Sequence, residues 1–145
     1  MSSPTPASGT CLCGAVAFSV RLPTLFCVHC HCSMCRRSHG AAFVTWIGVP
    51  RSQFDIVQGE DALLRYDSSE HGWRSFCGRC GSSLFCENQS HPDQVDIVLA
   101  NIRGSFAPAP QAHIFWDDRA SWTVVADDLP RLGGKSGTEP VEEGG

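Results

Sequence analysis

The sequence predicts a mainly β protein whose corners are held by bound metal. Short runs rich in β-branched and aromatic residues recur along the chain, and Gly, Pro and Asp residues separate them. No long stretch shows helical periodicity. Most of the nine cysteines fall in closely spaced groups, which is typical of metal sites in a protein that lacks an export signal.

The predicted strands are short, and several follow the period of two that a half-buried strand requires. In residues 15–21, for example, Val and Phe alternate with smaller or polar side chains. One turn of helix is expected at residues 33–39, with Ser33 as its cap and Gly40 as its end. Strands are expected at residues 15–21, 25–28, 42–49, 54–57, 63–66, 84–87, 95–100, 113–116 and 122–125.

Length and composition favour one domain with a disordered tail at each end. The chain has 145 residues, of which 42% are hydrophobic and 18% are charged. Residues 1–8 are rich in Ser and Pro, and residues 133–145 are rich in Gly and Glu, so disorder is expected in both. The expected zinc-binding domain therefore spans residues 9–132.

The charge and hydropathy argue against several function classes. A net charge of -4 and a pI of about 5.8 disfavour a domain that grips nucleic acid, which normally shows a basic excess. No apolar run approaches the roughly 20 residues of a membrane span. The N-terminus lacks the basic start and apolar segment of a secretory signal, so a cytoplasmic location is expected.

Two cysteine pairs that are far apart in the sequence predict a closed metal site. Cys11 and Cys13 stand one residue apart, Cys77 and Cys80 stand two residues apart, and a glycine follows each pair. Zinc binds about four thiolates tetrahedrally, and four protein ligands leave no open position. A metal bound by both pairs would also close a long loop of the chain, which removes much entropy from the unfolded chain. We therefore expect a structural zinc here, against the plainer interpretation that these are core cysteines.

A second cluster, Cys30, Cys32 and Cys35, offers three thiolates and room for a fourth ligand. Three protein ligands with one open position are typical of catalytic zinc, and such a zinc lowers the pKa of a thiol that enters. Three anionic sulfurs make the metal a weaker Lewis acid than one held by three histidines, but it still holds an exchangeable thiolate well, which suits sulfur substrates more than hydrolysis. Cys27 offers an alternative, because with it the four cysteines form a closed site.

Charged and titratable residues beside this cluster are candidates for substrate contact. Arg36 and Arg37 could receive the carboxylates of an anionic substrate, or they could be ordinary solvated side chains. His31 and His39 are the candidate general bases, and strand alternation predicts that His31 points away from the metal. His113 is expected in the core or at the surface.

Taken together and in this order, these motifs resemble the glutathione-dependent formaldehyde-activating enzyme family, which includes centromere protein V. The resemblance covers residues 9 to 132 and rests on Cys11-x-Cys13-Gly14, Cys30-His31-Cys32-x2-Cys35-Arg36-Arg37, Phe76-Cys77-x2-Cys80-Gly81-Ser82 and the segment Trp122 to Pro130. It implies a β-tent of short antiparallel sheets and two zinc ions per chain. By similarity, the structural zinc is held by Cys11, Cys13, Cys77 and Cys80, and the catalytic zinc by Cys30, Cys32 and Cys35. Cys27 and Cys86 depart from the family pattern.

The resemblance also implies carbon–sulfur lyase chemistry that serves formaldehyde detoxification. In the family's named reaction, glutathione and formaldehyde join reversibly as S-hydroxymethylglutathione. A small-molecule thiol such as glutathione is the expected partner, with neither nucleic acid nor membrane. The alternative is a non-catalytic binding module that is stabilised by two closed zinc sites. The fourth ligand of the second zinc distinguishes the two: sulfur from Cys27 favours the module, and water or an added thiol favours the enzyme. A methionine sulfoxide reductase is disfavoured, since it needs a dedicated redox cysteine and only Cys86 is left over.

Overall fold

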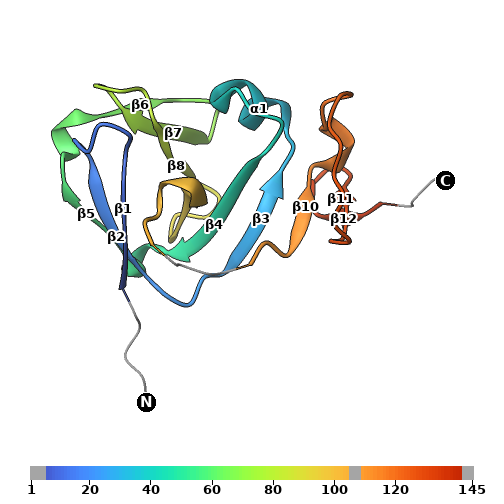
Figure 1. The fold of residues 1–145 in the computed structure, drawn as a ribbon, viewed down its shortest axis with the longest axis horizontal. Coiled ribbons are helices and arrows are strands. Elements are labelled where there is room, and N and C mark those ends of the chain that lie inside the picture. The colour runs from blue at the N-terminus through green and yellow to red at the C-terminus, as the bar shows by residue number, and fades with distance from the viewer. Residues whose placement is uncertain (1–5, 105–108, 142–145) are drawn as a thin grey trace, which may run out of the picture. The chain divides into compact units, whose positions relative to one another are not determined.

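The chain forms two compact units, each assembled from two segments that are far apart in the sequence (Figure 1). Among the residues that the structure describes, the first unit contains 6–26 and 47–104, and the second contains 27–46 and 109–141. This computed structural model describes residues 6–104 and 109–141. No helix in these described segments is long and apolar enough to cross a membrane.

A three-stranded antiparallel sheet forms one part of the first unit. Its strands are, in spatial order, β1 (Pro6–Thr10), β2 (Ala17–Arg21) and β5 (Phe54–Gln58). Phe18 and Val20 are fully buried, as the alternating pattern of this strand requires. The ring of Phe18 packs edge-on against Phe85 at 5.1 Å, and Phe85 packs in the same way against Phe54 at 4.8 Å. These rings form the centre of the unit's core.

The first unit also contains a run of four antiparallel strands. These are β6 (Leu63–Tyr66), β7 (Gly72–Cys77), β8 (Ser83–Asn88) and β9 (Gln94–Val98). Leu84, Val95 and Ile97 are buried and supply apolar contacts to the core. The connections include three short 3-10 helices, η1 (Arg51–Gln53), η2 (Glu60–Ala62) and η3 (Leu99–Asn101). Cys77 is the last residue of β7 and Cys80 lies in the turn before β8, so a cysteine pair lies at the connection between two neighbouring strands of this run.

The second unit contains one short α-helix within the described part of the chain. It contains β3 (Phe26–Cys30), α1 (Ser33–His39), β10 (Ala112–Ile114), η4 (Trp116–Asp118), β11 (Leu132–Gly133) and β12 (Glu139–Pro140). Strand β4 (Val44–Pro50) begins in this unit and ends in the first. β10 pairs with β3 in parallel, which sets His113 opposite His29. The pairing therefore brings a distant histidine beside the cysteine loop.

The expected mainly β fold is confirmed, and the helical turn lies where it was expected. α1 begins at Ser33 and ends at His39, and Gly40 follows in the left-handed region with φ 60°. The cap is Cys32 instead of Ser33, because the Cys32 Sγ accepts the N–H of Cys35 at 3.3 Å. The prediction of Ser33 as the cap is therefore wrong by one position.

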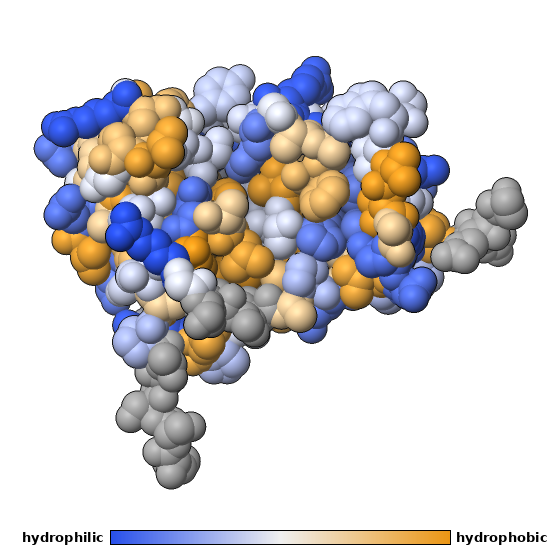
Figure 2. All heavy atoms as spheres, in the orientation of Figure 1, coloured by the Kyte–Doolittle hydropathy of each residue, from blue (hydrophilic) through white to orange (hydrophobic). Residues whose placement is uncertain are grey.

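Other expectations differ from the structure. Residues 122–125 form no strand, and Trp122 and Val124 are 69% and 93% exposed, so the apolar run is not buried. Residues 6–8 belong to β1, and residues 139–140 form β12, although the composition placed both in tails. The single domain expected over residues 9–132 stays a prediction. Figure 2 shows apolar side chains interspersed with hydrophilic ones on one face.

Candidate metal centres

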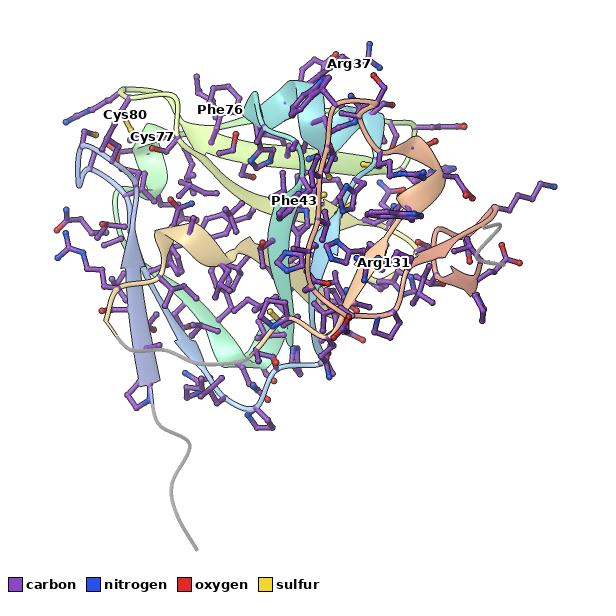
Figure 3. All side chains as sticks on the ribbon, turned by 45° about the vertical axis from the view of Figure 1, so that its right-hand side comes forward. Arg37, Phe43, Phe76, Cys77, Cys80 and Arg131 are labelled. Carbon is purple, nitrogen blue, oxygen red and sulfur yellow. The ribbon has the colours of Figure 1, made fainter. Side chains whose placement is uncertain are left out.

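Four cysteine sulfurs meet in the first unit. Cys11 and Cys13 lie in the turn between β1 and β2. Cys77 is the last residue of β7, and Cys80 lies in the turn that follows (Figure 3). All four Sγ atoms lie within 4.8 Å of one another. The Cys11–Cys13 and Cys13–Cys77 Sγ distances are 3.6 and 3.8 Å. A tetrahedron with metal–sulfur bonds of about 2.3 Å has edges of about 3.8 Å, so donor type and spacing both fit zinc.

Backbone N–H groups and one serine organise these turns. The N–H of Val16 donates to Cys11 Sγ at 3.3 Å. The N–H of Leu12 donates to Ser82 Oγ at 2.9 Å, which ties the two cysteine turns together. Ser82 Oγ lies 3.1 Å from Cys80 Sγ, and hydrogen bonding from Ser82 lowers the pKa of Cys80 to about 5. Cys80 is therefore disposed to the thiolate form that a metal binds.

Three further cysteines converge in the second unit. Cys30 ends β3, Cys32 caps α1, and Cys35 lies in the first turn of α1. Their Sγ atoms lie within 4.8 Å of one another, with 3.5 Å between those of Cys30 and Cys35. All three are at most 9% exposed. The thiols of Cys32 and Cys35, and then burial, raise the pKa of Cys30. A bound cation would offset the cost of ionising these sulfurs, and the set fits zinc with three ligands.

Cys27 lies outside this sulfur group. Among residues 6–104 and 109–141, the group consists of Cys30, Cys32 and Cys35. Cys27 and Cys30 are three positions apart in β3, and residues at odd separations point to opposite faces of a strand. Cys27 is 1% exposed, and burial raises its pKa. The geometry therefore favours three protein ligands over four.

The two arginines that follow the cluster have different surroundings. Arg36 is half-buried, and its Nε donates to the carbonyl oxygen of His31 at 3.3 Å. Arg37 is exposed on α1 (Figure 3), and its Nε donates to the carbonyl oxygen of Ser33 at 3.4 Å. Both arginines keep further N–H groups that these two bonds do not use. Their role toward a substrate stays a prediction, as do the metal-binding roles of the cysteines.

A chain of hydrogen bonds links three residues in the second unit. Asp127 Oδ2 lies 2.9 Å from His113 Nε2, and His113 Nδ1 lies 2.8 Å from His31 Nε2. Both histidines are fully buried. Burial, and then the proximity of His113, lowers the pKa of His31 to about 4. The hydrogen bond with His113 lowers the pKa of Asp127. At neutral pH, His31 is therefore neutral and Asp127 is ionised.

His29, His113 and Asp127 form a third group whose donor atoms lie within 4.8 Å of one another. Both ring nitrogens of His113 already take part in hydrogen bonds. The guanidinium of Arg131 lies 3.2 Å from Asp127 Oδ1, and a positive charge so close disfavours a second cation. We therefore interpret this group as a hydrogen-bond network.

Comparison with known proteins decides the family. A family model described as glutathione-dependent formaldehyde-activating enzyme matches residues 6–118, which include both cysteine clusters. The chain belongs to this family. A Halomonas elongata protein named "Putative glutathione-dependent formaldehyde-activating enzyme" is 26% identical over 124 residues, which cover 81% of this chain and 79% of that protein. A crystal structure of a Rhodobacter sphaeroides protein has a TM-score of 0.58 and 28% identity, and the match covers 68% of this chain and 90% of that one.

Membership in the formaldehyde-activating enzyme family confirms the resemblance seen in the cysteine motifs. Sequence reasoning did not single out Asp127, and it placed His113 only in the core or at the surface. His31 and His113 are 82 positions apart, and His113 and Asp127 are 14 apart. No local spacing marks such a chain, because the parallel β3–β10 pairing creates it.

Proposed function

We propose that this member of the formaldehyde-activating enzyme family is a zinc-dependent carbon–sulfur lyase. It joins glutathione or a related thiol to formaldehyde reversibly, as S-hydroxymethylglutathione. One observation carries the proposal: Cys30, Cys32 and Cys35 form a buried group of three sulfurs, which leaves a tetrahedral ion one position for a thiol. The family's description supports the choice of glutathione and formaldehyde as substrates.

Two zinc ions per chain belong to this proposal. Cys11, Cys13, Cys77 and Cys80 would hold the structural ion, and Cys30, Cys32 and Cys35 would hold the catalytic one. When bound to the second group, zinc stabilises a substrate thiol in its thiolate form near neutral pH. We also propose a cytoplasmic location, because metal binding needs the cysteines reduced.

The chain's own residues bind the substrate and exclude water. Arg36 and Arg37 are proposed to orient the carboxylates of glutathione through charge-assisted hydrogen bonds. The cysteine group is buried, which strengthens electrostatic interactions with any charge held there. In the forward direction the thiol sulfur forms a bond to the carbonyl carbon of formaldehyde. The thiol gives up one proton, and the former carbonyl oxygen gains one.

Exchange NMR on a mixture of glutathione and formaldehyde tests this function. The adduct also forms unaided, so the readout is the exchange rate above background. We expect zinc-loaded protein to raise the rate clearly, and Cys32→Ser to return it to background with one of two zinc ions lost. A Cys32→Ser protein that folds correctly and keeps the full rate contradicts the proposal.

Cys27→Ala is the matched control for Cys32→Ser. It removes a cysteine of the same stretch that lies outside the three-sulfur group. We expect it to keep two zinc ions and the wild-type exchange rate. If Cys27→Ala instead loses one zinc, the second site is closed by four cysteines. That result supports the alternative of a non-catalytic binding module.

A further inference from the structure

Ser82 contacts both of the turns that carry the first cysteine cluster. Its Oγ accepts the N–H of Leu12 at 2.9 Å and lies 3.1 Å from Cys80 Sγ. Its carbonyl oxygen accepts the N–H of Cys77 at 2.9 Å. Leu12 stands between the two cysteines of the other pair. Ser82 therefore touches both pairs without being one of the four sulfur donors.

The hydrogen bond between Ser82 and Leu12 joins the same two chain segments that a bound metal would join. The two residues are 70 positions apart. Cys13 and Cys77, whose sulfurs lie 3.8 Å apart, are separated by 64 positions. The bond restrains the distance between the two turns without using any sulfur atom. Ligands that are already held in position lose less freedom when they bind, and this favours tighter binding.

The hydroxyl of Ser82 can satisfy both of its partners at once. A hydroxyl has one hydrogen to donate and two lone pairs that accept, whereas a backbone N–H only donates. Ser82 Oγ is therefore the acceptor toward Leu12 and keeps its own hydrogen for Cys80 Sγ. Groups that hydrogen-bond a metal ligand orient that ligand, and their loss commonly lowers metal affinity.

We infer that Ser82 is a positioning residue for the first metal ion, because it holds the two cysteine turns against each other and orients Cys80 Sγ. It forms no bond to the metal in this role. The inference rests on the structural metal site of the proposed function. It does not rest on the lyase reaction, since it concerns only how firmly the first ion is held.

Ser82→Ala tests this role by competition with a chelator. The change removes the hydroxyl but keeps the four cysteines and the backbone bond to Cys77. We expect the affinity for the first ion to fall roughly 10–100-fold and that for the second ion to stay unchanged. Ser83→Ala is the matched control, since it makes the same change at the next, equally half-buried residue and should retain both ions. A folded Ser82→Ala that holds the first ion as firmly as the wild type overturns the inference.

Cadmium NMR shows which of the two sites is affected, because each bound ion gives its own signal and cadmium also binds thiolates. The signal of the first ion is the one that Cys80→Ser abolishes. In Ser82→Ala we expect this signal to move, since Cys80 loses a hydrogen bond, and the second signal to stay. Ser82→Thr keeps a hydroxyl and should restore both the signal and the retention of the first ion. Movement of both signals, or of neither, overturns the inference.

Leu12→Pro removes the same hydrogen bond from its donor side, and it serves if Ser82→Ala does not fold. Leu12 is the second residue of a turn in which the N–H of Gly14 bonds to the carbonyl oxygen of Cys11 at 3.2 Å. Proline is favoured at this position of a turn and has no N–H. The Leu12 side chain is 88% exposed, so its loss costs little.

We expect Leu12→Pro to weaken retention of the first ion. Leu12→Ala keeps the N–H and should leave retention unchanged. Equal retention of the first ion in these two variants overturns the inference.

The inference and the proposed function fail separately. If the wild type gives no cadmium signal that Cys80→Ser abolishes, the first metal site is wrong and this inference falls with it. If both ions bind but Ser82→Ala and Leu12→Pro retain them as the wild type does, only the inference is wrong. In either case the exchange rate of glutathione and formaldehyde decides the lyase activity.

Discussion

Asp96 in β9 couples the stability of the protein to pH. Burial raises the pKa of its carboxyl group to about 6, although Gln94 Nε2 donates a 2.8 Å hydrogen bond to Oδ1. The ordinary pKa of aspartate in an unfolded chain is about 3.9. Between these values the folded state binds more protons than the unfolded state. The free energy of unfolding should therefore fall as pH rises from about 4 to about 6.

Asp96→Asn should stabilise the protein at neutral pH. The amide still accepts from Gln94 but carries no charge, so we expect roughly 1–3 kcal/mol more unfolding free energy at pH 7. Urea unfolding at pH 7 and pH 4 measures this, and the gain should nearly vanish at pH 4. Asp93→Asn, at an exposed position, is the control. An equal gain at both pH values would show that the buried charge is not the cause.

At the scale of single residues, the sequence predicted the grouping of the cysteines but not the contact between the two histidines. Cys30, Cys32 and Cys35 are close in the chain, so their spacing alone brings three sulfurs together. The contact between His31 and His113 depends on the β3–β10 register, and that register is absent from any local pattern. The exclusion of Cys27 from the sulfur group follows from strand alternation, once the strand is known to continue to Cys30.

At the scale of elements, the end of β5 packs directly against the turn that carries Cys11 and Cys13. Gly59 follows β5 with φ +80°, and a Cβ there would lie 1.9 Å from the carbonyl oxygen of Ala15. Only glycine fits both the positive φ and this close approach. The backbone that shapes the first cysteine turn is therefore supported by a residue 46 positions after Cys13.

Gly59→Ala should destabilise the protein by on the order of 2–4 kcal/mol, because the Ala15 backbone must move. We also expect the first zinc to be lost at a lower chelator concentration. Gly104→Ala is the matched control, since Gly104 has φ +78° and no atom of the described residues lies within 4 Å of the added Cβ. It should cost only about 1–2 kcal/mol. Equal losses in the two variants would show that the contact with Ala15 is unimportant.

Elements with a strong period were predictable, and elements without one were not. Alternation located β2, and the Gly40 signal located the end of α1. The run at residues 122–125 has the composition of a strand but forms none, and Trp122 and Val124 remain exposed, because composition does not specify a pairing partner. The β11–β12 pair lies where Gly and Glu favoured disorder, and two-residue strands leave no period to detect.

At the scale of the whole molecule, each compact unit contains one cysteine cluster. In the first unit the cluster joins the two chain segments, since Cys13 and Cys77 are 64 positions apart. A metal at this point would close a long loop and remove entropy from the unfolded chain. The second cluster lies within a single segment, because Cys30 and Cys35 are five positions apart. Loss of the first metal should therefore affect stability more than loss of the second.

Metal removal tests this difference. We expect a chelator to lower Tm by roughly 10 °C or more and to increase hydrogen exchange in β1, β2, β7 and β8. Cys80→Ser should reproduce most of the Tm loss, and Cys35→Ser should reproduce less of it. Equal Tm losses in the two variants, or none after complete zinc removal, would contradict the structural role of the first site.

The division into two units was not predictable from the sequence. Each unit is discontinuous, so no composition change or linker marks its boundary. Length favoured one domain, and the widely separated cysteine pairs indicated only that distant segments meet. The family and its cysteine motifs were identifiable, because cysteines that could bind one metal ion stand at short fixed spacings in each motif.

The discontinuous units also set an order of events during translation. Cys30, Cys32 and Cys35 leave the ribosome almost together, so their site can receive metal early. Cys11 and Cys13 leave the ribosome first, but their site stays incomplete until Cys77 emerges, which follows Cys13 by 64 residues. At about 5–20 residues per second, this delay is roughly 3–13 s. The thiols of Cys11 and Cys13 therefore need reducing surroundings throughout that interval to avoid oxidation. His113 and Asp127 join the second unit only after both cysteine sets have emerged.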